Sequence, residues 1–496
     1  MKLQKIKING FRGIENVEIT FNEMLNFIVS NNNVGKTRIL ECINQFYNGA
    51  KENLDVEFTY NVSDGDKIII QECLNMAETV PEGSITIILK NKKYSYKKYD
   101  AKKLIEEKII GEVLYVPAVS DHNNITDVSK TSTDISKMVS KLLEKNNSVE
   151  NKLKQLNDDL KEYIKLLQEE SRSTISKMNQ EILFGNIELS LENKEFDNSQ
   201  IIKNNIQLKA KEDGEERDIS SLGTGVQRSI VNSIITAGID SQKYTILLYD
   251  EPETFLNVNL QRKLMQEINN NKENTQYIIA THSPDIIYRN EKIFSSIIKL
   301  KKKDKNNIKV FQFDNNKYVD LIRQTNIELN QRVQLVENIN ESVLAWWDRN
   351  RVNALFEDKV LIIEGPTEEI FLDMVCTEKN IPYITTASGK FTIPYFKILF
   401  EDIFDIKIAV MYDKDDISDP KHGSINDYII NNINDYLVLD KDFESYLGYN
   451  TIDKRRKPQE FLEKYFNNEI SNDKILQLKQ AIYSLYYGDD NSYEQK

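Results

Sequence analysis

Hydrophobic residues in the first 120 positions occur in short runs that are rich in β-branched and aromatic side chains and are bounded by Asn and Gly. Such runs predict strands, grouped around one helix that contains Ile39, Leu40 and Ile43. From about residue 205 to 300 strand-like and helix-like patterns alternate, as in a parallel sheet. A second alternating pattern begins at Val360. The pattern therefore predicts an α/β fold in both parts of the chain.

Residues 128–182 differ from both parts, because they are rich in Lys, Glu, Asn and Ser. Their apolar positions recur at intervals of three and four, which predicts an amphipathic helix; they are Leu153, Leu156, Leu160, Tyr163 and Leu167. The helix fits either a dimerisation arm or a helical lobe packed on the sheet. The lobe is preferred because the periodic stretch is short for a coiled coil.

We predict three regions from these patterns. Residues 1–317 form the first domain, with the helical insertion at about 128–182, and residues 357–496 form the second. A helical connector at 318–356 carries Trp346 and Trp347, which we interpret as packing residues rather than a platform for stacked bases.

Length and composition place the chain among globular proteins with more than one domain. At 496 residues it is too long for a single core. No apolar run approaches the roughly 20 residues of a membrane span, and the first residues lack the features of a signal peptide. The cysteines Cys42, Cys73 and Cys376 form no CxxC pair, so a reduced, cytoplasmic location is expected.

The net charge of -13 weighs against a nucleic-acid-binding protein, but only weakly, because phosphate contacts need no more than a local basic patch. Two patches stand out, at 299–305 (KLKKKDK) and 454–457 (KRRK). Taken alone, each patch is more typical of a solvated charged surface.

The segment from Ser30 to Thr37 predicts a phosphate-binding loop, since it follows an apolar strand and precedes a helical pattern. Lys36 is expected to contact the β- and γ-phosphates, and Thr37 to bind Mg²⁺ through its hydroxyl. Backbone N–H groups around the phosphates complete the predicted site, contributed by Asn32, Asn33 and Gly35. Ser30 departs from the usual glycine, and Asn33 replaces another frequent glycine but tolerates positive φ.

Three further motifs support an ATP site. A buried strand ends at Asp250 and Glu251, where carboxylates hold the Mg²⁺ shell and orient the attacking water. The next strand ends before His282, at the usual place of a γ-phosphate sensor. Between these motifs and the loop, glycines open an apolar helix; the residues singled out are Ser221, Gly223 and Gly225.

The four motifs, in this order, resemble the ABC-type ATPase heads of the SMC and RecF group. In that group the Ser-Leu-Gly-Thr-Gly stretch contacts ATP held by a partner protomer. The resemblance therefore implies that two copies of the chain enclose ATP between them.

A second set of acidic residues lies at the ends of two later strands. Glu364 ends the first, Glu368 lies one turn along the following helix, and Asp413 and Asp415 end the second. Parallel strands bring such ends to one edge, so these four side chains are predicted to surround one or two divalent cations. Oxygen ligands without His or Cys suit Mg²⁺ or Mn²⁺, which activate water for phosphodiester cleavage.

The strand-Glu-Gly and strand-Asp-x-Asp arrangement resembles the Toprim domain, a Rossmann-like parallel sheet, with Gly389 in the loop where that family has glycine. Nearly the whole chain resembles the OLD (overcoming lysogenization defect) nucleases, which include the nuclease subunit of the Gabija antiphage system. IIEGPTEEIF at 362–371 and LDKDFE at 439–444 carry this resemblance. It implies that Glu444 joins the metal site and that a lysine stabilises the transition state; Lys457 matches best, with Lys454 as the alternative.

We therefore expect a DNA endonuclease that depends on Mg²⁺ or Mn²⁺ and is regulated by ATP, acting in antiphage defence as a homodimer or higher homo-oligomer. Family resemblance adds a companion helicase or retron component. Whether ATP activates or inhibits cleavage stays open. The alternatives are a RecF- or SMC-like repair ATPase whose Toprim domain only binds DNA, and a non-enzymatic nucleotide sensor.

Overall fold

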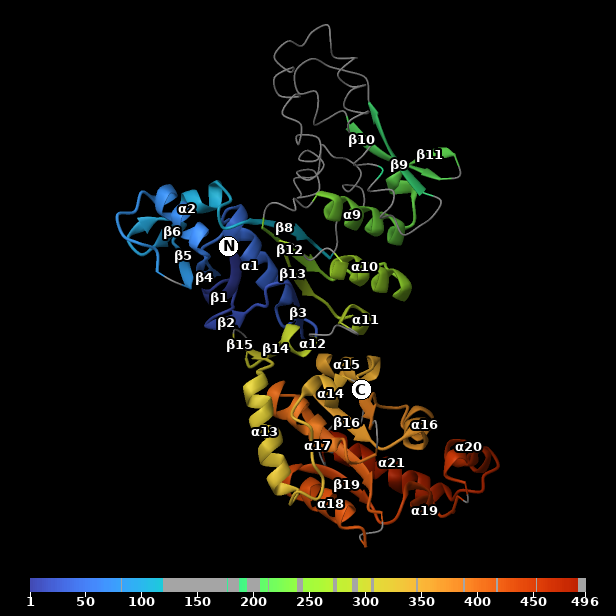
Figure 1. Cartoon of the computed structure of the whole chain (residues 1–496). Coiled ribbons are helices and arrows are strands. Elements are labelled where there is room, and N and C mark those ends of the chain that lie inside the picture. Colours follow the sequence, from blue (N-terminus) through green and yellow to red (C-terminus); the bar gives the residue numbers. More distant parts are fainter. Residues whose placement is uncertain are drawn as a thin grey trace. The chain divides into compact units, whose positions relative to one another are not determined.

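A computed structural model describes residues 1–81, 83–118, 176, 187–193, 206–212, 214–238, 244–270, 274–287, 293–304, 307–344, 347–386, 389–415, 418–451 and 453–488 (Figure 1). The chain divides into two compact units. The first comprises Met1–Ile28, Gly35–Ile286 and Lys302–Ile308, and the second comprises Val29–Val34, Ile287–Lys301 and Lys309–Lys496. The helix predicted within 128–182 lies outside the described residues, apart from the single position 176. No helix in the described ranges is long and apolar enough to span a membrane.

The first unit begins with an antiparallel sheet in the order β2-β1-β4-β5-β6-β7. Its strands are β1 (Lys2–Gly10), β2 (Val17–Thr20), β4 (Asp55–Asn61), β5 (Ser84–Lys90), β6 (Lys93–Tyr96) and β7 (Tyr99–Asp100). Every second residue of β4 is buried, which is the pattern of a sheet with one covered face. On that face Phe58 stacks on Phe46 of α1 (Lys36–Asn48), with ring centroids 3.8 Å apart. Two helices complete this part, α2 (Asp64–Leu74) and α3 (Lys102–Glu106).

Parallel strands form the centre of the first unit. The strands β3 (Leu25–Val29), β13 (Thr275–Ala280), β12 (Thr245–Asp250) and β8 (Glu112–Val116) lie side by side in that order. The first three are buried along their whole length, as expected of a parallel sheet with both faces covered. The fold class predicted from alternating strand and helix patterns is therefore confirmed here.

Further helices and short strands lie between and after the strands of this sheet in the sequence. The helices are η2 (Ile219–Ser221), α9 (Thr224–Gly238), α10 (Val258–Asn270), α11 (Pro284–Ile287) and α12 (Ile293–Ser296). The strands β9 (Ile187–Asn193), β10 (Ile206–Glu212) and β11 (Glu215–Asp218) pair antiparallel with one another. Two more strands, β14 (Ile297–Lys302) and β15 (Ile308–Gln312), follow in the chain.

The second unit has a four-stranded sheet in the order β17-β16-β18-β19, with every pairing parallel. Its strands are β16 (Lys359–Ile363), β17 (Tyr383–Thr385), β18 (Lys407–Asp413) and β19 (Asp435–Leu439). The helices are α13 (Asn315–Glu328), α14 (Ile339–Ser342), α15 (Arg349–Asn353), η4 (Ala354–Phe356), α16 (Pro366–Val375), α17 (Ile393–Phe396), η5 (Lys397–Ile403), α18 (Pro420–Asn432), α19 (Phe443–Leu447), η6 (Lys454–Arg456), α20 (Lys457–Phe466) and α21 (Asn472–Tyr487). One core joins β16 and β18 to α16, α19, α20 and α21.

Two sequence interpretations are decided within the second unit. Trp347 is buried and packs edge-on against Phe294, with centroids 4.9 Å apart, which confirms its packing role; Trp346 lies outside the described residues. The interpretation of the 299–305 patch as a solvated surface is wrong for Lys299. This side chain is 1% exposed and donates to the carbonyl oxygens of Leu355 and Glu357 at 2.7 and 2.8 Å.

We predict that Phe371→Ala lowers the free energy of unfolding of the second unit by about 3–5 kcal/mol, because Phe371 is fully buried and truncation leaves a cavity. Phe466→Ala is the matched control: this ring is 68% exposed, so its loss should cost less than about 0.5 kcal/mol. The two tryptophans of the chain, Trp346 and Trp347, are neighbours in the sequence, and Trp347 belongs to the second unit. Tryptophan fluorescence during urea unfolding therefore reports on this unit. Equal effects of the two substitutions would contradict the predicted core.

Candidate nucleotide and metal sites

Within the first unit, the last two residues of the predicted phosphate loop contact residues of the other predicted ATP motifs. Thr37, in the first turn of α1, donates a hydrogen bond from Oγ1 to Oδ1 of Asp250, at 3.1 Å. Lys36 Nζ contacts Nε2 of His282, which follows β13. Four residues predicted from three separate motifs therefore lie together, at the carboxyl ends of two neighbouring parallel strands and the start of a helix.

Backbone conformation explains which residues form the turn before α1. Asn33 has φ 62 and Gly35 has φ 130, both in the region that L-residues rarely adopt. Asn33 thus has the conformation for which asparagine substitutes for glycine. Ser30, at the usual first glycine, is buried and donates from Oγ to the carbonyl oxygen of Asn31 at 2.7 Å.

Burial controls the ionisation of these groups. Burial raises the pKa of Asp250, and the nearby carboxylate of Glu251 raises it further. Burial lowers the pKa of Lys36 to about 8. The pKa of His282 is also lowered, chiefly by burial and to a smaller extent by the charge of Lys36. Each charge is therefore poorly solvated. The chemistry suits a nucleotide triphosphate with a divalent cation, since Lys36 would gain phosphate oxygens and Asp250 a cation.

Three residues near this site were missed by the sequence interpretation. Glu253 is half-buried and accepts a hydrogen bond at 2.7 Å from the backbone N–H of His282. Tyr115 at the end of β8 donates to Oδ2 of Asp250 at 3.4 Å, and Arg228 donates to the carbonyl oxygen of Asp250 at 3.4 Å. Glu253 belongs to the same acidic run as the predicted carboxylates, and Arg228 ends the signature stretch at 220–228, so both were detectable, whereas Tyr115 carries no motif.

The signature segment opens α9 as predicted. A Cβ atom on Gly225 would lie 2.7 Å from the carbonyl oxygen of Phe255, so only glycine fits there, whereas a Cβ on Gly223 would meet nothing within 4 Å. Gly223 and Ser221 are exposed, and Oγ of Ser221 donates to the carbonyl oxygen of Asp218 at 2.6 Å. Steric need explains Gly225 but leaves Gly223 without a structural reason.

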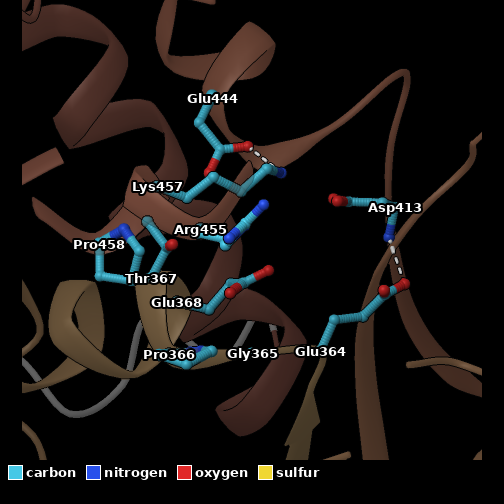
Figure 2. Close-up of a pocket in the computed structure, with 10 residues that line it drawn as sticks. All are labelled: Glu364, Gly365, Pro366, Thr367, Glu368, Asp413, Glu444, Arg455, Lys457 and Pro458. Carbon is cyan, nitrogen blue, oxygen red and sulfur yellow. Dashed lines mark hydrogen bonds and ion pairs between the residues drawn. The ribbon is translucent and has the colours of Figure 1, made fainter. Parts of the chain in front are cut away.

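In the second unit the carboxyl ends of β16 and β18 deliver predicted acids to one edge (Figure 2). The backbone N–H of Asp413 donates to Oε1 of Glu364 at 2.9 Å. Glu368 lies in the first turn of α16, which Pro366 begins. A cavity of about 300 Å³ is lined by these three acids and by Gly365, Pro366, Thr367, Glu444, Arg455, Lys457 and Pro458.

Glu444 and Lys457 reach the same cavity from α19 and the start of α20. Lys457 Nζ donates to Oε2 of Glu444 at 2.6 Å, and the Glu444 side chain is 1% exposed. Of the two lysines considered from the sequence, Lys457 therefore lines the cavity, and the side chain of Lys454 is outside what the structure describes.

The acidic groups of the cavity are held at an electrostatic cost. Burial raises the pKa of Glu364 and of Glu368 to about 7, and burial and the charge of Glu364 raise the pKa of Asp413 to about 8. Burial opposes the charge of Lys457, but its hydrogen bond to Glu444 and the surrounding carboxylates raise its pKa overall. The carboxylates therefore outnumber the positive charges that line the cavity with them.

These residues fit a divalent cation. Oδ1 of Asp413 and Oε1 of Glu444 are buried, and neither accepts a hydrogen bond from any described residue. Buried oxygens of this kind are normally paired, and oxygen-only donors suit Mg²⁺ or Mn²⁺. Among the described residues no three acidic, His or Cys side chains already converge as closely as metal ligands do. The acidic side chains thus line one cavity but lie farther apart than the ligands of a bound metal.

Asp415 is not among the residues that line the cavity, although its charge acts on Glu364 and Asp413. It has φ 53, and its Oδ2 lies 2.9 Å from Nζ of Lys390 and 3.3 Å from Nδ1 of His422. Lys390 is 1% exposed and also donates to the carbonyl oxygens of Asp413 and Lys414 at 2.8 and 3.0 Å. Lys390 thus holds the backbone at the end of β18 and in the turn that follows it. Its sequence neighbour Gly389 was noticed, but nothing in the sequence marked the lysine itself as buried.

Fold and sites together define a P-loop ATPase domain followed by a Toprim domain. Residues 25–287 match the family model described as "AAA domain, putative AbiEii toxin, Type IV TA system", and the chain belongs to this AAA-domain family. Residues 355–415 match the TOPRIM domain of overcoming-lysogenization-defect-like proteins. The predicted combination of an ATPase domain with an OLD-type Toprim domain is confirmed, and such domains use a nucleotide and a divalent metal.

Two curated relatives are similar to the chain. It is 23% identical over 436 residues to Endonuclease GajA of Bacillus cereus (strain VD045), covering 77% of this chain and 69% of GajA. It is 43% identical over 53 residues to Septu protein PtuA of Bacillus thuringiensis, covering 10% of this chain and 13% of PtuA. Among solved structures, an SMC head bound to the C-terminal winged-helix domain of ScpA is 15% identical, with a TM-score of 0.42, and the match covers 64% of this chain and 99% of that one. A likeness at this TM-score carries no functional argument.

We predict that Lys390→Met lowers the free energy of unfolding of the second unit by about 2–4 kcal/mol, because two carbonyl oxygens lose their buried donor. Lys407→Met, at an exposed position on the other end of β18, should change it by less than about 0.5 kcal/mol. Urea unfolding followed by tryptophan fluorescence compares them. A Lys390→Met protein as stable as the control would show that these hydrogen bonds are dispensable.

Proposed function

We propose that this protein is a DNA endonuclease that depends on a divalent metal and is regulated by nucleotide bound to its ATPase domain. The observation that carries the proposal is the cavity lined by four carboxylates, three of them buried, beside the ammonium of Lys457. A protein that merely binds DNA has no use for so much buried negative charge, which repels a phosphodiester. Similarity to an endonuclease over 77% of the chain supports the same activity.

The chain's own residues have distinct tasks in this proposal. Glu364, Glu368, Asp413 and Glu444 are proposed to hold one or two Mg²⁺ or Mn²⁺ ions, with Asp415 as a further ligand if its turn rearranges away from Lys390. The metal supplies an activated water and stabilisation of the leaving oxygen. Lys457 then stabilises charge on the equatorial phosphate oxygens.

We propose the established roles of P-loop ATPases for the residues of the four ATP-site motifs. Lys36 binds the β- and γ-phosphates, with backbone groups of Asn32, Asn33 and Gly35, and Thr37 and Asp250 hold Mg²⁺. Glu251 orients the attacking water, and His282 senses the γ-phosphate. Ser221, Gly223 and Gly225 contact ATP bound to a second copy. The exposure of Gly223 without steric need supports this last role.

Context is proposed from the relatives and the cysteines. Similarity to GajA and PtuA supports a role in antiphage defence, in a homodimer or larger homo-oligomer and with a companion protein such as a helicase or retron component. The three cysteines are unpaired and buried, which supports a cytoplasmic location. We also keep the division into 1–317, 318–356 and 357–496 as a proposal.

Asp413→Asn should reduce cleavage of supercoiled plasmid at least about 100-fold in Mg²⁺ or Mn²⁺, because an uncharged amide is a poor ligand for a hard cation. ATP hydrolysis should stay within about twofold. Asp427→Asn, an exposed position on nearby α18, is the control and should cleave normally. A wild-type protein that hydrolyses ATP yet cleaves no DNA with either metal would favour the alternative, a repair ATPase whose Toprim domain binds DNA.

Glu251→Gln should reduce ATP hydrolysis about 100-fold while ATP still binds, since the amide cannot orient the attacking water as the carboxylate does. Lys36→Ala should lose binding and hydrolysis together, because the phosphates lose their cation. Fluorescent-nucleotide titration and phosphate release separate the two effects. Plasmid cleavage by the ATP-bound Glu251→Gln protein then gives the sign of regulation. Normal hydrolysis in Glu251→Gln would remove this residue from the proposed site.

A further inference from the structure

Two cations, Lys457 and Arg455, line the acidic cavity. The ammonium of Lys457 is committed to Glu444, at 2.6 Å, and is about three-quarters buried. Arg455 differs in both respects. Its side chain is 95% exposed, and the nearest carboxylate oxygen recorded for it among the described residues, Oδ1 of Asp453, lies 4.0 Å from its Nε.

The backbone of Arg455 is fixed although its side chain is exposed. Asp453 caps the short helix η6, and its Oδ1 accepts a hydrogen bond from the backbone N–H of Arg455 at 3.0 Å. The N–H of Arg456 donates to the carbonyl oxygen of Asp453 at 2.8 Å. Because α20 begins directly afterwards at Lys457, the turn places Arg455 at the rim of the cavity. Figure 2 shows its guanidinium directed between Lys457 and Glu368.

The neighbouring Arg456 provides a comparison within the same turn. Its guanidinium pairs with Glu463 of α20 at 3.3 Å, and it is not among the residues lining the cavity. One arginine of the KRRK patch is thus tied to its own helix, while the other presents its donors to the opening. An interpretation of the whole patch as a solvated surface does not account for this difference.

We propose that Arg455 binds a backbone phosphate of the DNA substrate at the mouth of the cavity, next to the phosphate that is cleaved. This inference rests on the proposed nuclease function. A guanidinium offers planar, paired donors that match phosphate oxygens. The acidic cavity repels a phosphodiester, so an exposed guanidinium at its rim offsets that repulsion where the strand enters. Arg455 is therefore a substrate-binding residue, and its contribution belongs to binding rather than to the chemical step.

The test compares Arg455→Ala with Arg456→Ala in the full-length chain, using a short duplex and Mg²⁺ or Mn²⁺. Arg455→Ala should raise KM about tenfold with kcat within about twofold, since one charge-assisted phosphate contact is lost. The slope of log KM against log salt should become shallower by about one. Arg456→Ala should change KM less than twofold, and Arg455→Lys should fall between wild type and Arg455→Ala.

A second measurement separates this inference from the proposed function. The same arginine substitutions are made in the Asp413→Asn protein, and the Kd for the duplex is measured without cleavage, with thermal unfolding as the folding control. Weaker binding for Arg455→Ala alone supports the inference. Cleavage by wild type with equal effects of the two arginine substitutions overturns it and leaves the nuclease intact. Loss of kcat at unchanged KM also overturns it, because Arg455 would then act in the chemical step.

Discussion

Parallel strand pairing is the constraint on which both sites depend, because it decides which sequence-distant residues share an edge. Asp250, the last residue of β12, is paired with Ala280, the last residue of β13. His282, which follows β13, therefore lies at the same edge of the sheet as Asp250. In the second unit Ile362 pairs with Val410, which brings Glu364 and Asp413 within one hydrogen bond of each other. A shift of one residue in either register would turn these side chains to the opposite face of the sheet.

The same strand pairing brings several carboxylates close together in the second unit. Their burial and mutual repulsion cost free energy, which the fold tolerates. Buried carboxylates are usually neutralised by partners, yet Glu364 and Glu368 have pKa values raised from 4.5 to about 7, chiefly by burial. These groups keep protons in the folded chain that the unfolded chain has already released. Their contribution to stability therefore falls as pH rises from about 4.5 to about 7, and is restored by whatever cation occupies the cavity. Carboxylates whose pKa values are shifted in this way, at a cost to stability, are typical of functional sites.

The features that depend on residues close together in the chain could be predicted from the sequence. The buried strands, the acids at their ends, the positive φ of Asn33 and the opening of α9 by glycine all follow from neighbours in the chain. Long-range packing decided the rest. Lys299 and Lys390 look like ordinary surface lysines in the sequence, yet each is buried against carbonyl oxygens from elsewhere in the second unit. Asp415 has the spacing of a ligand, and it also pairs with Lys390, a contact that no pattern of residues could indicate.

The pairing of Lys457 with Glu444 gives the cavity a positively charged side chain that does not act as a base. Lys457 donates to Oε2 of Glu444, whereas Oε1 of the same carboxylate is buried and accepts nothing from the described residues. One carboxylate thus fixes the ammonium on one side and keeps an oxygen for a metal on the other. Because the pair raises the pKa of Lys457 against the effect of burial, the lysine stays protonated and cannot remove a proton from water. In the proposed reaction this geometry would suit a fixed positive charge beside the phosphate, and a metal held by the surrounding carboxylates would supply the nucleophile.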